Sequence, residues 1–289
     1  MQAHTVRDLI ESKFDHVDVE IVPIRTSGDG GNREVLGSFV KEIQEALLDH
    51  RVDVALHCLK DLPTRPVDGL KIGAYLKRED PTDALISHAD GWSQLPHGAV
   101  VGTGSVRRTS QLAAIRPDLQ FKPLVGNVDT RMRKLQERIY DAIVLATAGL
   151  TRLGVMEHWD TSEYANLHVE PLPILPAAGQ AILVLEVRNG TPILNLIESF
   201  NDDATQRASI AERAFLNFFG TGCSMPVAAH AKIDGEKLTL DGLVASPDGV
   251  RVLRSTESGD GVDAAGIGVR LADRLCADGA RELLPEGIA

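Results

Sequence analysis

The chain has 289 residues, a net charge of −11 and a pI of about 5.3, with 43% hydrophobic and 25% charged residues. This acidic balance argues against a general nucleic-acid or membrane-surface binder, because such proteins are usually basic. The length gives room for two or three domains with their own cores, and no apolar run reaches the about 18 residues that a membrane span needs.

The start of the chain and its cysteines indicate the compartment. Residues 1–7 lack the apolar segment of a signal peptide. Cys58, Cys223 and Cys276 are odd in number and far apart, which predicts neither a disulfide framework nor a metal site. We expect a cytoplasmic protein without a metal and without a nucleic-acid or membrane partner.

Strand-like and helix-like segments alternate over the first half of the chain. The sequence predicts strands at residues 17–24, 52–57, 70–76, 84–87, 99–102, 121–124 and 142–147. Helices are predicted between them at about residues 39–49, 106–115 and 130–137. This alternation predicts an α/β fold with mostly parallel sheets.

The second half has a different pattern. A strand-like run at residues 179–186 follows a proline-rich segment, and a helix is expected at about residues 203–218. Strands at residues 237–244 and 250–255 are expected to pair antiparallel across the turn Ser246-Pro247-Asp248-Gly249, before a last helix at about residues 264–278. The segments 78–83 and 171–176 contain prolines and are candidate crossings between domains.

Three segments place arginines beside glycine-containing turns: residues 102–108, 126–131 and 149–152. A turn that opens a helix leaves backbone N–H groups unpaired, and guanidinium groups bind carboxylates or phosphates through two hydrogen bonds. All three segments follow predicted strands, where ligands of such sheets bind. They predict a site for a small polyanion, although the pair Arg107 and Arg108 is also compatible with a solvated helix face.

Two further positions carry candidate chemistry. Lys60 and Asp61 directly follow a predicted strand, and an ionised aspartate there can accept N–H groups and stabilise a developing cation. A surface turn with an ion pair is the alternative. Cys223 lies between Gly222 and Ser224. It is either a small buried hydrophobe or a nucleophile or covalent anchor.

Taken in chain order, these segments resemble the porphobilinogen deaminase, or hydroxymethylbilane synthase, family over almost the whole chain. The matching segments are residues 57–63, 78–81, 102–108, 126–131, 148–152, 176–180, 211–214 and 222–223. The resemblance implies an α/β fold with two domains like type 2 periplasmic binding proteins, a central cleft and a smaller α+β C-terminal domain. The expected bounds are 1–77 with 178–198 for the first domain, 81–174 for the second and 202–289 for the third, in a monomer.

The resemblance also implies the reaction. Four porphobilinogen units would be joined, each with loss of ammonia, to a dipyrromethane cofactor held by a thioether to Cys223, and hydroxymethylbilane would be released for tetrapyrrole biosynthesis. Asp61 matches the catalytic aspartate of the family. The implied cofactor-binding residues besides Cys223 are Lys60, Thr103, Ser105, Arg107, Arg108 and Arg131, and the implied substrate-binding residues are Gln2, Arg152 and Arg213.

Three departures from the family pattern keep a second hypothesis open. Family members usually carry a strand ahead of the Gln2-Ala3 pair, so we expect a sheet that lacks its first strand. Val125 stands where an arginine is usual, and Leu36 stands where the mobile lid, here residues 28–39, usually has a lysine. The alternative is therefore a non-catalytic relative that binds a small polycarboxylate.

Overall fold

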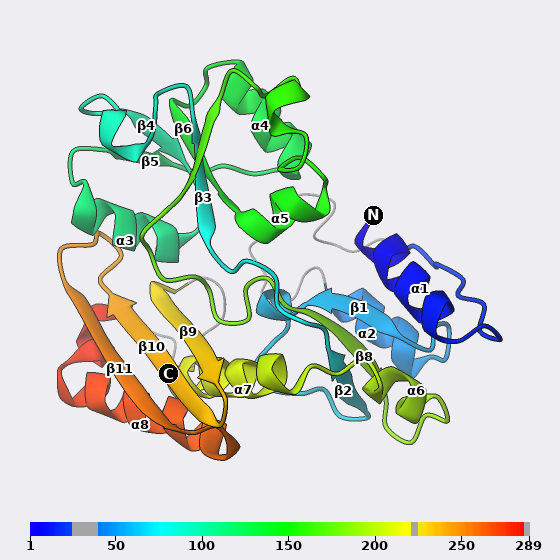
Figure 1. Cartoon of the computed structure of the whole chain (residues 1–289). Coiled ribbons are helices and arrows are strands. Elements are labelled where there is room, and N and C mark those ends of the chain that lie inside the picture. The colour runs from blue at the N-terminus through cyan, green and yellow to red at the C-terminus, as the bar shows by residue number, and fades with distance from the viewer. Residues whose placement is uncertain (25–39, 221–224, 286–289) are drawn as a thin grey trace.

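The computed structural model describes residues 1–24, 40–220 and 225–285, which form three sheets with their helices (Figure 1). The strand orders are β1-β8-β2, β5-β4-β6-β3-β7 and β11-β10-β9. Short 3₁₀ turns lie at Leu59–Asp61, Trp92–Gln94, Trp159–Thr161, Gly261–Asp263 and Ala280–Leu283.

The first sheet places β8 (Leu183–Arg188) between β1 (Ala55–Cys58) and β2 (Leu70–Tyr75), and both pairings are antiparallel. β8 takes the centre because five of its six residues are buried. The helices of this part are α1 (Gln2–Lys13), α2 (Lys41–Leu48) and α6 (Leu194–Glu198). Val6 and Ile10 of α1 belong to the same core cluster as Leu185 and Val187 of β8.

The second sheet is mixed. It contains β5 (Gln120–Lys122), β4 (Val100–Gly102), β6 (Ala142–Ala146), β3 (Asp83–Ser87) and β7 (His168–Pro171), with α3 (Val106–Ile115), α4 (Val128–Gln136) and α5 (Thr147–Arg152). Alternate residues of its central strands enter two different cores: Ile86 and Ile143 pack in one, Leu85 and Val144 in the other. The sheet therefore has a buried core on each face.

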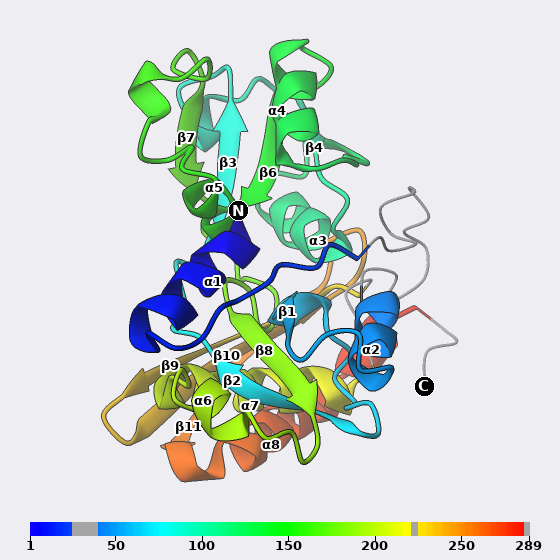
Figure 2. The same cartoon turned by 90° about the vertical axis from the view of Figure 1, so that its right-hand side faces the viewer.

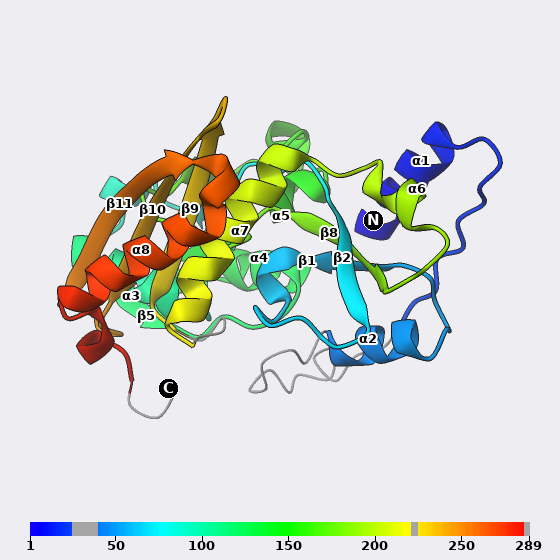
Figure 3. The ribbon, with the colours of Figure 1, turned by 90° about the horizontal axis from the view of Figure 1, so that it is seen from below.

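The third sheet is an antiparallel meander of β9 (Val227–Asp234), β10 (Lys237–Ala245) and β11 (Val252–Asp260). The helices α7 (Asp203–Phe218) and α8 (Ala264–Ala277) cover one face of it (Figure 3). Gly242 allows this approach, because a Cβ atom there would lie 2.7 Å from the ring of Phe215.

A fully buried carboxylate joins the parts of the molecule. Glu212 of α7 accepts hydrogen bonds from Arg78 Nη1 at 2.5 Å, Gly179 N at 2.7 Å and Ala231 N at 2.8 Å. Arg78 lies between β2 and β3, Gly179 lies before β8, and Ala231 lies in β9. One side chain thus holds the crossing segments against the third sheet.

Most predicted elements are confirmed. The helices expected at residues 106–115 and 203–218 match α3 and α7, and the expected strands 70–76, 99–102 and 142–147 match β2, β4 and β6 to within a residue at each end. The prediction of mostly parallel sheets is wrong, because β8 enters the first sheet antiparallel and β3 pairs antiparallel with both neighbours. The alternation rule assumes that every strand continues in the same direction, whereas the chain re-enters the first sheet from the opposite end.

The strand predicted at residues 17–24 is also wrong. The segment carries no strand assignment, and no strand pairs with it in the described part of the chain. Helix α1 and strands β7 and β9 were not predicted. Only Val6 and Ile10 are buried in α1, which gives its sequence a weak apolar periodicity. None of the helices in the described ranges has the length and apolar composition that a bilayer crossing requires.

Candidate active site

Asp61 and Lys60 lie where β1 turns away from the first sheet. Leu59 is completely buried, and its N–H donates to Ile182 O at 2.9 Å, which fixes the 3₁₀ turn Leu59–Asp61 to the strand end. Gly179 packs on Leu59 with a φ of 73°, and a side chain there would lie 2.9 Å from Leu59 Cγ. The contacts of Leu59 with Ile182 and Gly179 therefore fix the position of the turn that carries Lys60 and Asp61.

The surroundings of these two side chains favour their neutral forms. Desolvation raises the pKa of Asp61, and the charges of Lys60 and His57 oppose that rise. Desolvation lowers the pKa of Lys60, and the charge of Asp61 opposes that fall. Lys60 Nζ also donates to Gln180 Oε1 at 3.3 Å. Asp61 is exposed to water at its surface, but the protein around it desolvates the carboxylate and so disfavours its charged form.

A buried ionic cluster lies next to them. Asp83, which is fully buried, accepts hydrogen bonds from Arg107 Nη2 at 2.8 Å and from Arg108 Nε and Nη2 at 3.0 and 2.7 Å. Gln180 Nε2 donates to the same carboxylate at 2.9 Å. Burial alone would raise the pKa of Asp83, but Arg107 and Arg108 lower it well below its usual range. Both guanidinium groups predicted to bind a ligand are thus already paired.

The predicted hydroxyl groups lie in the turn before α3. Thr103 Oγ1 accepts from Ser105 N at 3.2 Å, and Ser105 Oγ caps the helix by accepting from Arg108 N at 3.4 Å. Arg131, in α4, folds back so that its Nε donates to Gly126 O at 2.8 Å. These contacts order the turns that were predicted to bind an anion.

The predicted substrate residues approach the same region from three sides. Arg152 of α5 donates through Nε to Glu79 Oε1 at 2.9 Å and through Nη2 to Ala181 O at 2.8 Å. Arg213 of α7 donates to Leu62 O at 3.3 Å and Pro63 O at 2.5 Å, just past Asp61. Gln2, the first residue of α1, places Oε1 3.9 Å from Cys58 Sγ, at the end of β1.

Two sequence predictions lie outside the described residues: the anchor Cys223 and the lid, residues 28–39 with Leu36. The flanks of the anchor are described. α7 ends at Phe218, and Met225, before β9, is buried. Val125, which stands where an arginine is usual in the family, has 53% of its surface exposed.

Sequence reasoning gave no role to Asp83, Gln180 or Glu79, which hold the arginines and Lys60 in place. A signal for Asp83 was present, because it begins the apolar run of a buried strand. A charged residue in such a run needs a buried partner. Glu186 gave the same signal in β8: its Oε2 lies 3.2 Å from His57 Nε2, next to the Asp61 turn.

At the end of β1, then, lie a carboxylate whose pKa is raised and a lysine, and the buried cluster of Arg107, Arg108 and Asp83 lies next to that lysine. Shifted pKa values in such a cluster are typical of the active site of an enzyme, which makes this a candidate active site.

The chain belongs to the porphobilinogen deaminase family. The model of the porphobilinogen deaminase dipyrromethane cofactor-binding domain matches residues 1–195, and that of the porphobilinogen deaminase C-terminal domain matches residues 206–277. The porphobilinogen deaminase of Geobacter metallireducens is 42% identical over 296 residues, covering 99% of this chain and 90% of that protein. That of Nitratidesulfovibrio vulgaris strain Miyazaki F is 44% identical over 302 residues, covering 99% and 92%.

Family membership confirms several predictions. The chain is a transferase of tetrapyrrole biosynthesis, a hydroxymethylbilane synthase with a dipyrromethane cofactor, and the matches do not favour the non-catalytic alternative. The fold class is α/β, with strands and helices in three sheets, and residues 206–277 match the C-terminal domain of the family. Among solved structures, the periplasmic VFT2 domain of Bordetella pertussis BvgS is 15% identical, with a TM-score of 0.42, over 68% of this chain and 75% of that one.

Proposed function

We propose that this chain polymerises four porphobilinogen units on a dipyrromethane primer attached to Cys223, with Asp61 as the catalytic carboxylate. The observation that carries this assignment is the position of Asp61. It lies at the carboxyl end of β1 where water reaches it, and its neighbour Lys60, whose charge acts on it, also lies near Arg108 and Asp83. The proposal includes a cytoplasmic monomer that acts on free porphobilinogen without a nucleic-acid or membrane partner.

The charges of the site fit a primer that carries several carboxylates. Around Asp61 and Asp83, the cations Lys60, Arg107 and Arg108 outnumber the two carboxylates by one. A carboxylate-rich pyrrole would add the missing negative charge, and its N–H groups would find an acceptor in Asp61. When bound, the primer supplies the carbon nucleophile to which each new unit is joined.

Asp61 acts on the incoming unit through its fixed negative charge. As the C–N bond of the aminomethyl group breaks, ammonia leaves and positive charge develops on the pyrrole. An ionised carboxylate that accepts the pyrrole N–H stabilises that charge without reorganising. Burial raises the pKa of Asp61, and the charge of Lys60 opposes that rise and so favours the ionised form. Lys60 thereby tunes the charge that the reaction uses.

The other predicted residues bind and position carboxylate side chains. We propose that Thr103, Ser105 and Arg131 meet the carboxylates of the primer at the turns before α3 and α4, and that Arg107 and Arg108 bind the primer from the first turn of α3. Gln2, Arg152 and Arg213 would contact the incoming unit from α1, α5 and α7. The three separate sheets support a division into domains at 1–77 with 178–198, 81–174 and 202–289.

The test is the intact mass of the purified chain before and after addition of porphobilinogen. The expected result is the polypeptide plus one dipyrromethane, followed by steps of one pyrrole unit. Asp61→Asn should keep the primer mass and lose the steps, whereas Cys223→Ser should have the bare polypeptide mass. A wild-type chain that carries the primer but never gains a step would contradict turnover, and Asp61→Asn with normal steps would remove Asp61 from the mechanism.

A further inference from the structure

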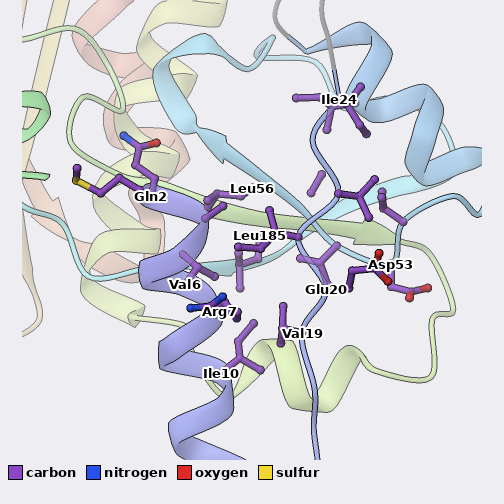
Figure 4. A pocket seen from close by; sticks show the side chains of 18 of the residues that line it. Gln2, Val6, Arg7, Ile10, Val19, Glu20, Ile24, Asp53, Leu56 and Leu185 are labelled. Carbon is purple, nitrogen blue, oxygen red and sulfur yellow. The ribbon is translucent and has the colours of Figure 1, made fainter. Parts of the chain in front are cut away.

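The strand β1 and the turn that follows it have different surroundings. Leu56 of β1 lines a cavity of about 1030 Å³ (Figure 4). Residues 17–24 cross between α1 and β1 there (Figure 2). Leu59, in the 3₁₀ turn after β1, packs instead with Leu62 and Tyr75 in a separate core cluster. The turn is therefore packed away from α1.

Helix α7 carries a polar stripe next to this cluster. Ser209, Arg213 and Asn217 are spaced by four residues, so their side chains follow one another along one face of the helix. α7 lies between β9 and β2, and it contacts both (Figure 3). The stripe thus belongs to a helix that covers the third sheet, but it lies beside the first sheet.

Two members of the stripe bond to the three residues that directly follow the turn. Arg213 Nη1 donates to Leu62 O at 3.3 Å, and its Nη2 donates to Pro63 O at 2.5 Å. Asn217 Oδ1 accepts from Thr64 Oγ1 at 3.1 Å. Successive positions of α7 therefore hold successive residues of the segment 62–64.

The third member extends these contacts to β2. Ser209 has no exposed surface, and its side chain hydrogen-bonds to Tyr75, on whose hydroxyl the charge of Arg213 also acts. Desolvation lowers the pKa of Arg213, and the charges of Tyr75 and Glu186 oppose that fall. Arg213 is thus a desolvated cation that its carbonyl partners and these charges stabilise in place.

We propose that Ser209, Arg213 and Asn217 are positioning residues, which hold the catalytic turn at the place where Asp61 acts. The turn is fixed at its start, where Leu59 N donates to Ile182 O, and the stripe fixes it just past its end. The inference rests on the proposed role of Asp61. Along the chain, α7 also leads to the proposed anchor Cys223, so one helix precedes the primer and holds the carboxylate.

The pair of Thr64 and Asn217 tests the proposal, because neither residue has a proposed contact with primer or substrate. Asp61 stabilises a charge that develops only in the transition state, so a displaced carboxylate slows turnover more than it weakens binding. Thr64→Val should lower kcat about threefold to tenfold, the range of one hydrogen bond, and change KM less than about twofold. Thr64→Ser retains the hydroxyl and should restore the rate.

Asn217→Ala should lower kcat as much as Thr64→Val does, and the double variant should be no slower than either single one, because both remove the same bond. Thr161→Val is the matched control. It removes a hydroxyl bond of similar length, from Thr161 Oγ1 to His158 O at 3.2 Å, in the second domain and should leave kcat unchanged.

Amide exchange reads the position of the turn without catalysis. Leu62 N donates to Leu59 O at 3.1 Å, so its exchange rate reports how well the turn is held. The rate should rise about threefold or more in Thr64→Val and Asn217→Ala but not in Thr64→Ser.

Three results would overturn the proposal: an unchanged Leu62 exchange rate in Thr64→Val, effects on kcat that multiply in the double variant, or Thr64→Ser as slow as Thr64→Val. A wild-type chain that never gains a pyrrole unit would instead contradict the proposed function. The exchange rates would then still show whether α7 holds the turn.

Discussion

Asp83 joins Arg107, Arg108 and Gln180 in one buried cluster, yet the sequence pattern assigned it no role. It accepts from Arg107, Arg108 and Gln180 with no exposed surface. Asp83→Asn should destabilise the protein by about 3–5 kcal/mol at neutral pH, because it leaves two buried guanidinium groups short of a counter-charge. Urea unfolding measures this, and the exposed Asp90→Asn serves as the matched control.

The pH dependence has a definite sign. Because the pKa of Asp83 is lowered in the folded state, its contribution is complete above the ordinary aspartate pKa and is lost only as pH falls through the lowered value. The difference between wild type and Asp83→Asn should therefore stay constant between about pH 5 and 8 and shrink only in strong acid. A difference that varied across neutral pH would contradict the pairing.

Replacing Asp61 should raise the stability of the protein and lower its activity, whereas replacing Asp83 lowers the stability. Its pKa is raised, so its ionised form costs folding free energy at neutral pH. Asp61→Asn should therefore stabilise the primer-free protein while lowering turnover by about 100-fold or more. Thermal unfolding and porphobilinogen consumption measure the two effects, with the exposed Asp68→Asn as control. A loss of stability together with activity would mean that the carboxylate supports the fold.

Lys60 should set the acid limb of the pH–rate profile. Its charge lowers the pKa of Asp61 against the effect of desolvation. Removing that charge in Lys60→Met should move the acid limb to higher pH, whereas Lys60→Arg should leave it near the wild-type position. Initial rates between about pH 5 and 9 distinguish these cases. A limb that stays in place in Lys60→Met would show that another group titrates there.

At the scale of elements, α5 is fastened to both segments that cross between the first two sheets. Arg152 bonds to Glu79 on one crossing and to Ala181 O on the other. Thr147 N, at the start of the same helix, donates to Thr82 O at 3.0 Å. Arg152 therefore has a structural contact as well as the proposed contact with substrate.

The two roles of Arg152 can be separated with Glu79. If Arg152 also binds a substrate carboxylate, Arg152→Ala should raise KM about tenfold or more, in line with the loss of a charged hydrogen bond. Glu79→Gln should change KM little, since it frees the guanidinium without removing it. Equal changes in KM for both variants would mean that Arg152 acts only through its structural contacts with Glu79 and Ala181 and does not bind the substrate.

At the scale of the whole molecule, the sequence predicted what depends on local pattern. α3 and α7 were predicted to the residue because capping residues and apolar periodicity agree there, as with the Ser105 and Asp202 caps. The position of β8 could not be predicted, because a buried apolar run carries no information about the direction of its neighbours. The pairing of Arg107 and Arg108 with Asp83 was missed for a related reason, since partners 24 and 25 residues apart are brought together only by the fold.

The contacts of Glu212 have a consequence for how the protein melts. This carboxylate bonds to a crossing segment through Arg78, to the approach to β8 through Gly179, and to β9 through Ala231. If any one of these parts unfolds, the buried carboxylate of Glu212 loses a hydrogen-bond partner, which destabilises the other parts. The three sheets should therefore unfold in a single calorimetric transition. In Glu212→Gln the heat-capacity trace should broaden or split, with the part around β9 to β11 separating from the rest. Cooperativity in this molecule would then depend on one charge at the junction of its sheets.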